Sequence, residues 1–120
     1  MKYIRTKDGI IESKRVKFLD NGQVELTDGK HSWRLDCFPI IKQADTIEEL
    51  CDEFVIKVDN EYLHAKYYHI DRTFYIYNTD EEIGLVECLR FNYIVYGAIW
   101  TDKGLIYVAK MNDKGELELL

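Results

Sequence analysis

The stretch Tyr93–Leu120, YIVYGAIWTDKGLIYVAKMNDKGELELL, decides the fold, because it reads as three antiparallel strands joined by two copies of one turn. The turn is Asp-Lys-Gly, at 102–104 and again at 113–115. It fits a three-residue hairpin loop whose last residue is a glycine in the left-handed conformation. The stretch therefore predicts a C-terminal three-stranded meander.

This loop type also predicts which residues face each other across the strands. It pairs Thr101 with Leu105, Ile99 with Tyr107, Gly97 with Ala109 and Tyr96 with Lys110, and then Met111 with Leu117, Lys110 with Glu118 and Ala109 with Leu119. Alternation with a period of two divides these residues into two faces. The uncharged face, which includes Ile99 and Tyr107, is predicted to be core.

The second face of the meander is apolar at one end and charged at the other. Its apolar end holds Tyr96, Trp100 and Ile106, whereas Lys110 and Glu118 form a cross-strand pair that favours contact with water. Large apolar patches are rarely left exposed on monomeric proteins. The apolar end is therefore either covered by a helix or used as a binding patch.

The rest of the chain predicts further strands and two short helices. Strands are expected at 2–5, 10–12, 16–19, 23–26, 31–36, 55–58, 62–69 and 73–78, with a break or an edge position at Pro39 and a short apolar-edged run at 40–43. A helix is expected at about 46–54, where Thr46 and Glu49 form a capping box and an apolar stripe is formed by Ile47, Leu50, Cys51 and Phe54. A second helix is expected at about 80–90, with Ile83, Val86 and Leu89 on its inner side. We therefore predict one α+β domain over 1–120, built mostly of antiparallel sheet.

Charge is unevenly distributed along the chain. Residues 1–43 hold nine Lys/Arg and six Asp/Glu, whereas residues 44–92 hold four Lys/Arg and twelve Asp/Glu, and the total is −6. An acidic middle argues against a nucleic-acid surface there, because phosphate contact needs positive charge. It fits a protein partner with a basic patch, although solubility alone also explains it.

The outer arc of the predicted helix 46–54 concentrates this negative charge. Glu48, Glu49, Asp52 and Glu53 lie there, and such a face is either simply solvated or a contact surface for a basic protein groove. With Tyr96, Trp100 and Ile106 these four residues make up the predicted partner-binding set.

Several kinds of chemistry have no support in the sequence. His31, His64 and His69 have no recognised ligand spacing, and neither the serines nor the cysteines sit in a nucleophile motif. No glycine-rich phosphate loop joins a strand to a helix. We therefore expect no enzyme, no metal and no cofactor.

The N-terminal residues are too polar for a signal sequence, and no apolar run is long enough to span a membrane. The sequence therefore predicts a cytoplasmic protein with reduced cysteines.

Three segments resemble small uncharacterised proteins encoded by phages and prophages of low-GC Gram-positive bacteria. The segments are MKYIRTKDGI at 1–10, IKQADTIEELCDEFV at 41–55 and YGAIWTDKGLIYVAKMNDKGELELL at 96–120. The resemblance implies an accessory protein inside a bacterial host, where such proteins often bind a host protein, including defence factors. No catalytic residue is implied by it.

The sequence thus predicts an acidic phage or prophage accessory protein that binds a host or phage protein, such as a defence or nucleic-acid enzyme that it inhibits. One alternative is sequestration of a small ligand such as a nucleotide in a pocket walled by Tyr67, Tyr75 and Tyr77. Another is a self-assembling structural protein with Trp100 and Ile106 in a homomeric interface.

Overall fold

A computed structural model describes residues 2–6, 9–13, 15–21, 23–27, 29–36 and 40–120 of the chain. Within these residues the fold is mostly antiparallel strand, as predicted. Its elements are β1 (Lys2–Thr6), β2 (Gly9–Ser13), β3 (Arg15–Phe18), β4 (Gln23–Thr27), β5 (Ser32–Asp36), β6 (Ile40–Ala44), the 3-10 helix η1 (Glu48–Leu50), β7 (Glu53–Val58), β8 (Glu61–Tyr68), β9 (Thr73–Ile76), β10 (Glu82–Gly84), α1 (Leu85–Arg90), β11 (Ile94–Thr101), β12 (Gly104–Met111) and β13 (Leu117–Leu119).

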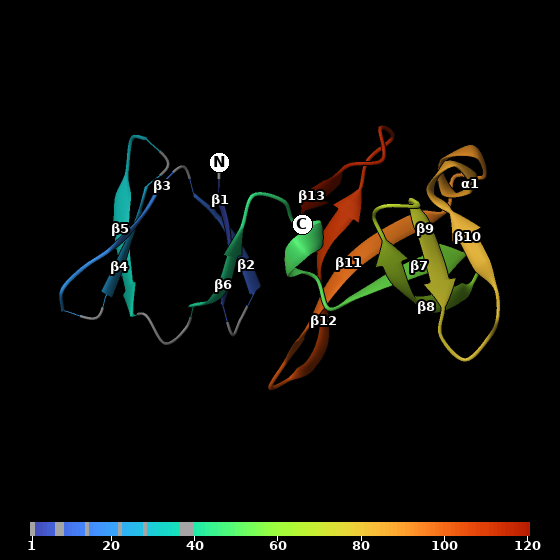
Figure 1. The fold of residues 1–120 in the computed structure, drawn as a ribbon, viewed down its shortest axis with the longest axis horizontal. Coiled ribbons are helices and arrows are strands. Elements are labelled where there is room, and N and C mark those ends of the chain that lie inside the picture. The colour runs from blue at the N-terminus through green and yellow to red at the C-terminus, as the bar shows by residue number, and fades with distance from the viewer. Residues whose placement is uncertain (1, 7–8, 14, 22, 28, 37–39) are drawn as a thin grey trace.

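The described strands form three sheets. The two N-terminal sheets have the orders β3-β4-β5 and β2-β1-β6, and the large sheet has the order β10-β9-β8-β7-β11-β12-β13. Figure 1 shows the N-terminal sheets on the left and the large sheet on the right. The residues whose sheet position the sequence left open, 60–78, thus form β8 and β9 between β7 and β10.

The sheets lie beside one another along the molecule, which makes it elongated. Its principal extents are 48 × 29 × 25 Å and its radius of gyration is 16.0 Å. A compact domain of this length has a radius of gyration of about 13.6 Å. The side-by-side arrangement leaves more of each sheet exposed than a stacked arrangement would.

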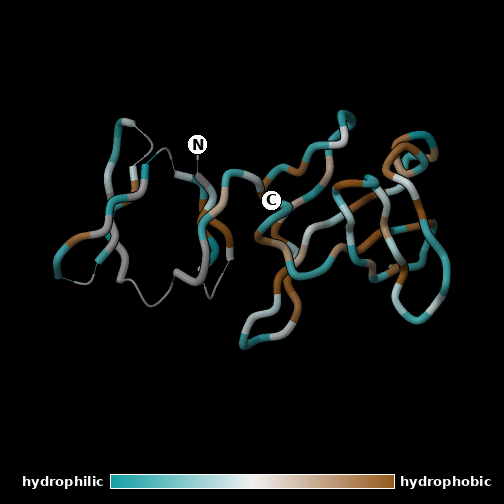
Figure 2. The backbone as a smooth tube through the Cα atoms, viewed as in Figure 1, coloured by the Kyte–Doolittle hydropathy of each residue, from teal (hydrophilic) through white to brown (hydrophobic). Residues whose placement is uncertain are grey.

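The main core lies on one face of the large sheet, which we name the inner face. Its buried residues come from six strands, from Ile47 just before η1 and from helix α1. They are Ile47, Phe54, Ile56, Ala65, Phe74, Ile76, Leu85, Cys88, Val95, Ile99, Val108, Ala109 and Leu117. Figure 2 shows apolar segments in these strands and in α1, and hydrophilic segments at the turns between them.

Gly97 marks the tightest packing on the inner face. A Cβ atom at this position would lie 2.7 Å from the Sγ atom of Cys51, closer than side chains tolerate. The absence of a side chain at Gly97 therefore lets the segment after η1 approach β11.

The register of the meander is partly as predicted. The pairs Gly97–Ala109 and Tyr96–Lys110 are confirmed, as are all three predicted pairs between β12 and β13. The predicted pairs nearer the first turn are wrong, because Thr101 pairs with Gly104, Trp100 with Leu105 and Ile99 with Ile106. A register shift between Gly97 and Ala98, which leaves Val108 as an extra residue on β12, restores the predicted pairing beyond it.

The first turn differs from the prediction because Thr101 closes it. Its Oγ1 accepts a hydrogen bond from the N–H of Lys103 (3.1 Å) and donates one to the carbonyl of Gly104 (2.9 Å). Gly104 therefore joins the ladder instead of ending the loop. As a consequence, Tyr107 lies on the exposed face and Ile106 lies on the inner face, the reverse of the prediction.

The predicted helix 46–54 is wrong. Only Glu48–Leu50 forms a turn of 3-10 helix, and Thr46 makes no capping bond to it. The chain is extended at Cys51, and β7 begins at Glu53 and pairs with β11. Strand pairing thus prevails over local helix propensity. The predicted apolar positions Ile47, Leu50 and Phe54 are nevertheless buried.

The predicted helix 80–90 is shorter than expected. Residues Glu82–Gly84 form β10 and pair with β9, so the helix begins only at Leu85. This shift changes which side chains point inward. Leu85 and Cys88 are buried, whereas Val86, predicted on the inner side, is exposed.

The predicted N-terminal strands all have counterparts in β1 to β6. Pro39, the predicted break, lies outside the described residues.

The hydroxyl of Ser13 joins the two N-terminal sheets. It accepts a hydrogen bond from the N–H of Thr27 (3.1 Å) and lies 2.7 Å from the carbonyl of Arg15. Tyr3 and Ile10 pack against the main core and so connect the β2-β1-β6 sheet to the large sheet.

Candidate functional site

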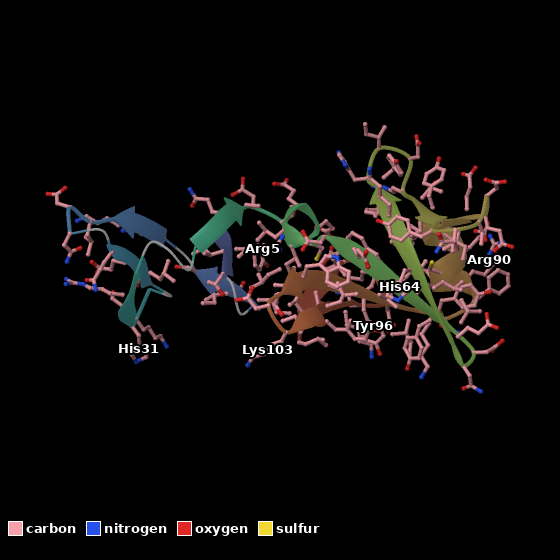
Figure 3. All side chains as sticks on the ribbon, turned by 90° about the horizontal axis from the view of Figure 1, so that it is seen from below. Arg5, His31, His64, Arg90, Tyr96 and Lys103 are labelled. Carbon is pink, nitrogen blue, oxygen red and sulfur yellow. The ribbon has the colours of Figure 1, made fainter. Side chains whose placement is uncertain are left out.

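The outer face of the large sheet is rich in aromatic side chains. The register places six of them on this side of four strands, and we name them the aromatic face: Tyr62 and Tyr68 on β8, Tyr75 on β9, Tyr96 and Trp100 on β11, and Tyr107 on β12. All but the half-buried Tyr96 are exposed. In Figure 3 Tyr96 projects from the lower side of the sheet.

The rings of the aromatic face are ordered by contacts with one another. Tyr96 and Tyr107 stack with their centroids 4.7 Å apart and their planes 11° apart, and Tyr68 meets Tyr75 edge-on at 4.7 Å. Burial raises the pKa of Tyr107, and the nearby Tyr62 and Tyr96 raise it further. Val55, the register neighbour of Tyr96 on the same face, is fully buried.

Trp100 is the most exposed ring of this face, with 55% of its surface open to solvent. Its backbone is nevertheless held on both sides. The N–H donates to Oδ2 of Asp52 (2.8 Å), and the carbonyl accepts from Nη2 of Arg5 (3.3 Å). The indole is therefore presented by a fixed backbone and does not sit on a loose loop.

Arg5 and Asp52 form the ion pair that holds Trp100. Arg5 Nη1 lies 2.5 Å from Oδ1 of Asp52 and Nη2 lies 2.7 Å from Oδ2, a two-bond arrangement that fixes both groups. The backbone N–H of Asp52 also donates to the carbonyl of Ala98 (2.9 Å). Figure 3 shows Arg5 where the N-terminal sheets meet the large sheet. We name this arrangement the Arg5–Asp52 clasp.

The clasp sets the ionisation of Asp52. Partial burial alone would raise its pKa, but the hydrogen bonds from Arg5 and from the Trp100 N–H, together with the charge of Arg5, outweigh burial and lower it. Asp52 is therefore an anion that serves structure. Nothing in the pattern of residues 46–54 indicated this role, because its partner lies 47 positions away on β1.

The predicted acidic surface is not one continuous helix face. Asp52 belongs to the clasp, and Glu53 lies at the start of β7 with its Oε2 3.2 Å from Nδ1 of His64. Glu48 is half-buried and Glu49 is exposed, both on η1. The structure thus divides the four carboxylates among three settings.

The predicted patch of Tyr96, Trp100 and Ile106 is also divided. Tyr96 and Trp100 lie on the aromatic face, whereas Ile106 pairs with Ile99 and packs against the main core. Exposed Tyr107 takes the place predicted for Ile106. A pairing shift of one residue is enough to exchange them, because alternate residues point to opposite faces.

A second feature is a cleft of about 600 Å³ at the open end of the inner face. Its apolar lining includes Phe54 and Tyr67, which belong to a cluster of rings with Phe74. Tyr67 was predicted to wall a ligand pocket with Tyr75 and Tyr77. That grouping is wrong, because Tyr75 and Tyr77 are exposed and do not line the cleft.

Charged side chains of both signs line the cleft. Glu48 comes from η1, His69 and Arg72 come from the turn between β8 and β9, and Lys114 and Glu116 come from the turn between β12 and β13. Burial raises the pKa of Tyr67, while Arg72 lowers it and Glu48 raises it. Arg72 and Glu48 therefore act on the pKa of Tyr67 in opposite directions.

Arg72 has an unusual backbone conformation. Its φ is +52°, in the left-handed region. Among the described non-glycine residues, Asp59, Asn78 and Asn92 also have positive φ. Asp and Asn adopt this region far more readily than Arg. The carbonyl of Arg72 accepts the N–H of Leu85 (2.8 Å), which fixes the turn beside the cleft.

Cys51 and His69 both line the cleft, together with the carboxylates of Glu48 and Asp52. Burial raises the pKa of Cys51 to about 12 and that of Cys88 to about 11, so both are thiols at neutral pH. Cys37 lies outside the described residues. No group of three potential metal ligands occurs in the part of the chain that the structure describes. Among the described residues, no helix is long and apolar enough to cross a bilayer.

Comparison of the chain with protein-family models, curated proteins and solved structures yields no match. The function is therefore argued from the aromatic face, the clasp and the cleft themselves.

Proposed function

We propose that the protein binds another protein through the aromatic face, with Trp100 as the anchor residue. One observation carries this proposal: an indole that is 55% exposed sits on a backbone that Arg5 and Asp52 hold from both sides. Trp and Tyr dominate the binding energy of protein interfaces, because they bury large areas with little loss of side-chain freedom. A fixed anchor loses still less entropy on binding.

Charge supports a basic protein as the partner. The chain carries a net charge of −6, and residues 44–92 alone carry four Lys/Arg against twelve Asp/Glu. Opposite charge on a partner accelerates association and favours it over acidic competitors. The phosphate-binding groove of a nucleic-acid enzyme has this chemistry. With the resemblance to phage accessory proteins, this makes inhibition of a host defence enzyme the specific function that we propose.

Nucleic acid itself fits the aromatic face less well than protein does. Aromatic sheets that stack bases also need a cationic groove along which the phosphates run. Lys57, Lys66 and Lys110 are interspersed on the outer face with Glu53 and Glu118, and two of the lysines lie over tyrosine rings. The mixed charge does not form such a groove.

The experiment is a capture from host lysate with three immobilised proteins: wild type, Trp100→Ala and Phe91→Ala. Phe91 is the matched control, because it is 56% exposed but lies after α1, away from the aromatic face. Lysates are treated with nuclease, and captured proteins are then purified and titrated. We expect wild type and Phe91→Ala to bind one basic protein alike, and Trp100→Ala to bind it about 30-fold more weakly, as removal of an anchor residue predicts.

Salt and self-association provide the remaining outcomes. Binding should weaken as salt rises from about 0.1 to about 0.5 M, because screening removes the long-range attraction. Wild type should be a monomer by light scattering. Equal titration curves for wild type and Trp100→Ala would contradict the proposal. A dimer that Trp100→Ala dissociates would favour the homomeric alternative instead.

A further inference from the structure

The cleft carries charges of opposite sign around an aromatic lining. Glu48 on η1, Tyr67 on β8 and Arg72 in the β8–β9 turn all line the cleft. The ring of Tyr67 lies 4.6 Å from that of Phe74 and 5.5 Å from that of Phe54, measured between centroids. The cleft thus combines aromatic rings and a hydroxyl with charges of both signs. The lining carboxylates are Glu48, Glu49, Asp52 and Glu116, and the lining cations are Lys66, Arg72 and Lys114.

The balance of charge selects the class of ligand. A phosphorylated ligand would bring two negative charges close to Glu48 and Glu116, which line the same cleft as Arg72 and Lys114. Like charges at short range oppose binding, whereas a ligand with one charge of each sign satisfies both groups. A volume of about 600 Å³ lies within the range of small-molecule sites.

Arg72 gives a separate reason to regard the cleft as built for a ligand. Its left-handed backbone is one that an arginine adopts at a cost in stability, and the surrounding turn keeps it there through the Leu85 hydrogen bond. Arg72 is one of the residues that line the cleft. In the described part of the chain Arg72 has no ion-pair partner within 4.0 Å.

We propose that the cleft binds a small zwitterion with a flat apolar group, of the class of a free aromatic amino acid. The carboxylate lies toward Arg72, the ammonium group lies toward Glu48, and the side-chain ring rests on Tyr67 and Phe54. None of the six residues of the aromatic face lines the cleft, although Asp52 of the clasp does. Ligand binding in the cleft stands or falls independently of partner binding.

The test is a titration, by calorimetry or NMR, with L-phenylalanine and three comparison compounds. Phenethylamine lacks the carboxylate, 3-phenylpropanoate lacks the ammonium group, and adenosine monophosphate represents the nucleotide alternative. We expect L-phenylalanine to bind in a saturable manner and each of the other three to bind about tenfold more weakly or worse.

Variants locate the site. Arg72→Gln and Glu48→Gln should each weaken L-phenylalanine binding about tenfold, the loss of one charged contact. Arg90→Gln and Glu61→Gln are matched controls, because both remove an exposed charge outside the cleft, and they should leave binding unchanged. Trp100→Ala should also leave it unchanged. Melting temperatures of all variants separate loss of binding from loss of folding.

Three outcomes would overturn the proposal. The first is that L-phenylalanine does not bind at concentrations up to about 10 mM, which corresponds to a very weak dissociation constant. The second is that the singly charged analogues bind as tightly as L-phenylalanine, and the third is that adenosine monophosphate binds more tightly. The last outcome would assign the cleft to nucleotides.

Discussion

The inner and outer faces of the large sheet are built from the same strands but are used differently. On β9, Phe74 points inward and is fully buried, whereas its neighbour Tyr75 points outward and is exposed. Residues of α1 and Ile47 beside η1 pack on the inner face, whereas the outer face presents exposed tyrosine, tryptophan and lysine side chains. The comparison teaches that stability resides on one face and recognition can reside on the other.

The largest predicted effect tests this division directly. Phe74→Ala should lower the free energy of unfolding by about 3–5 kcal/mol, because it removes a fully buried ring and leaves a cavity. Tyr75→Ala, the next residue along the same strand, should lower it by about 1 kcal/mol or less. Chemical denaturation of both variants measures the difference. Equal losses would show that the outer face is as much core as the inner one.

A smaller effect concerns the clasp. Asp52→Asn should lower the free energy of unfolding by about 1–3 kcal/mol, because Arg5 loses its charged partner. Glu53→Gln, which affects a pair with the half-exposed His64, should cost less than about 1 kcal/mol. Both are read from urea denaturation near pH 7. The reverse ranking would contradict the structural role given to Asp52.

The clasp also predicts a dependence on pH. The pKa of Asp52 in the folded protein lies below its ordinary value of 3.8, so the folded state holds the deprotonated form more firmly than the unfolded state does. The stabilisation is complete above about pH 5 and is lost as the pH falls through the folded pKa. The difference in the free energy of unfolding between wild type and Asp52→Asn should therefore shrink as the pH falls from about 5 to about 2. A difference that stays constant would exclude the clasp as its source.

The smallest effect sharpens the comparison at the cleft. Arg72→Gly should raise the free energy of unfolding or leave it unchanged, within about 1 kcal/mol, because glycine adopts positive φ without strain. Thermal unfolding measures it, with Arg90→Gly at the end of α1 as the destabilising control. A clear loss of stability at Arg72→Gly would mean that the arginine side chain supports the fold.

Local sequence signals identified much of the architecture. Alternation and the Asp-Lys-Gly turns predicted the meander, and Tyr96 with Lys110 and Lys110 with Glu118 pair as expected. The burial of Ile47, Leu50 and Phe54 was also predicted correctly, although from the wrong conformation. An apolar spacing of three and four residues does not distinguish a helix from a short turn followed by a strand, because both bury those positions.

The features that the sequence did not reveal depend on residues far apart in the chain. Arg5 meets Asp52 across 47 positions and the Trp100 carbonyl across 95. The extra residue on β12 exchanges Ile106 for Tyr107 on the outer face, and only the assembled strands show it. The cleft likewise joins three separate turns. Local propensity and residue spacing carry no information about contacts between residues so far apart in the chain.

The most direct test of partner binding through the aromatic face is the solvent exposure of Trp100 with and without partner. The chain has two tryptophans, so Trp33→Phe leaves Trp100 as the only indole. Acrylamide should quench its fluorescence readily in the free protein, because 55% of the residue is exposed. Saturation with the captured basic protein should reduce the quenching constant severalfold, since anchor residues become fully desolvated at interfaces. An unchanged quenching constant in the complex would contradict the account, because the partner would then bind elsewhere.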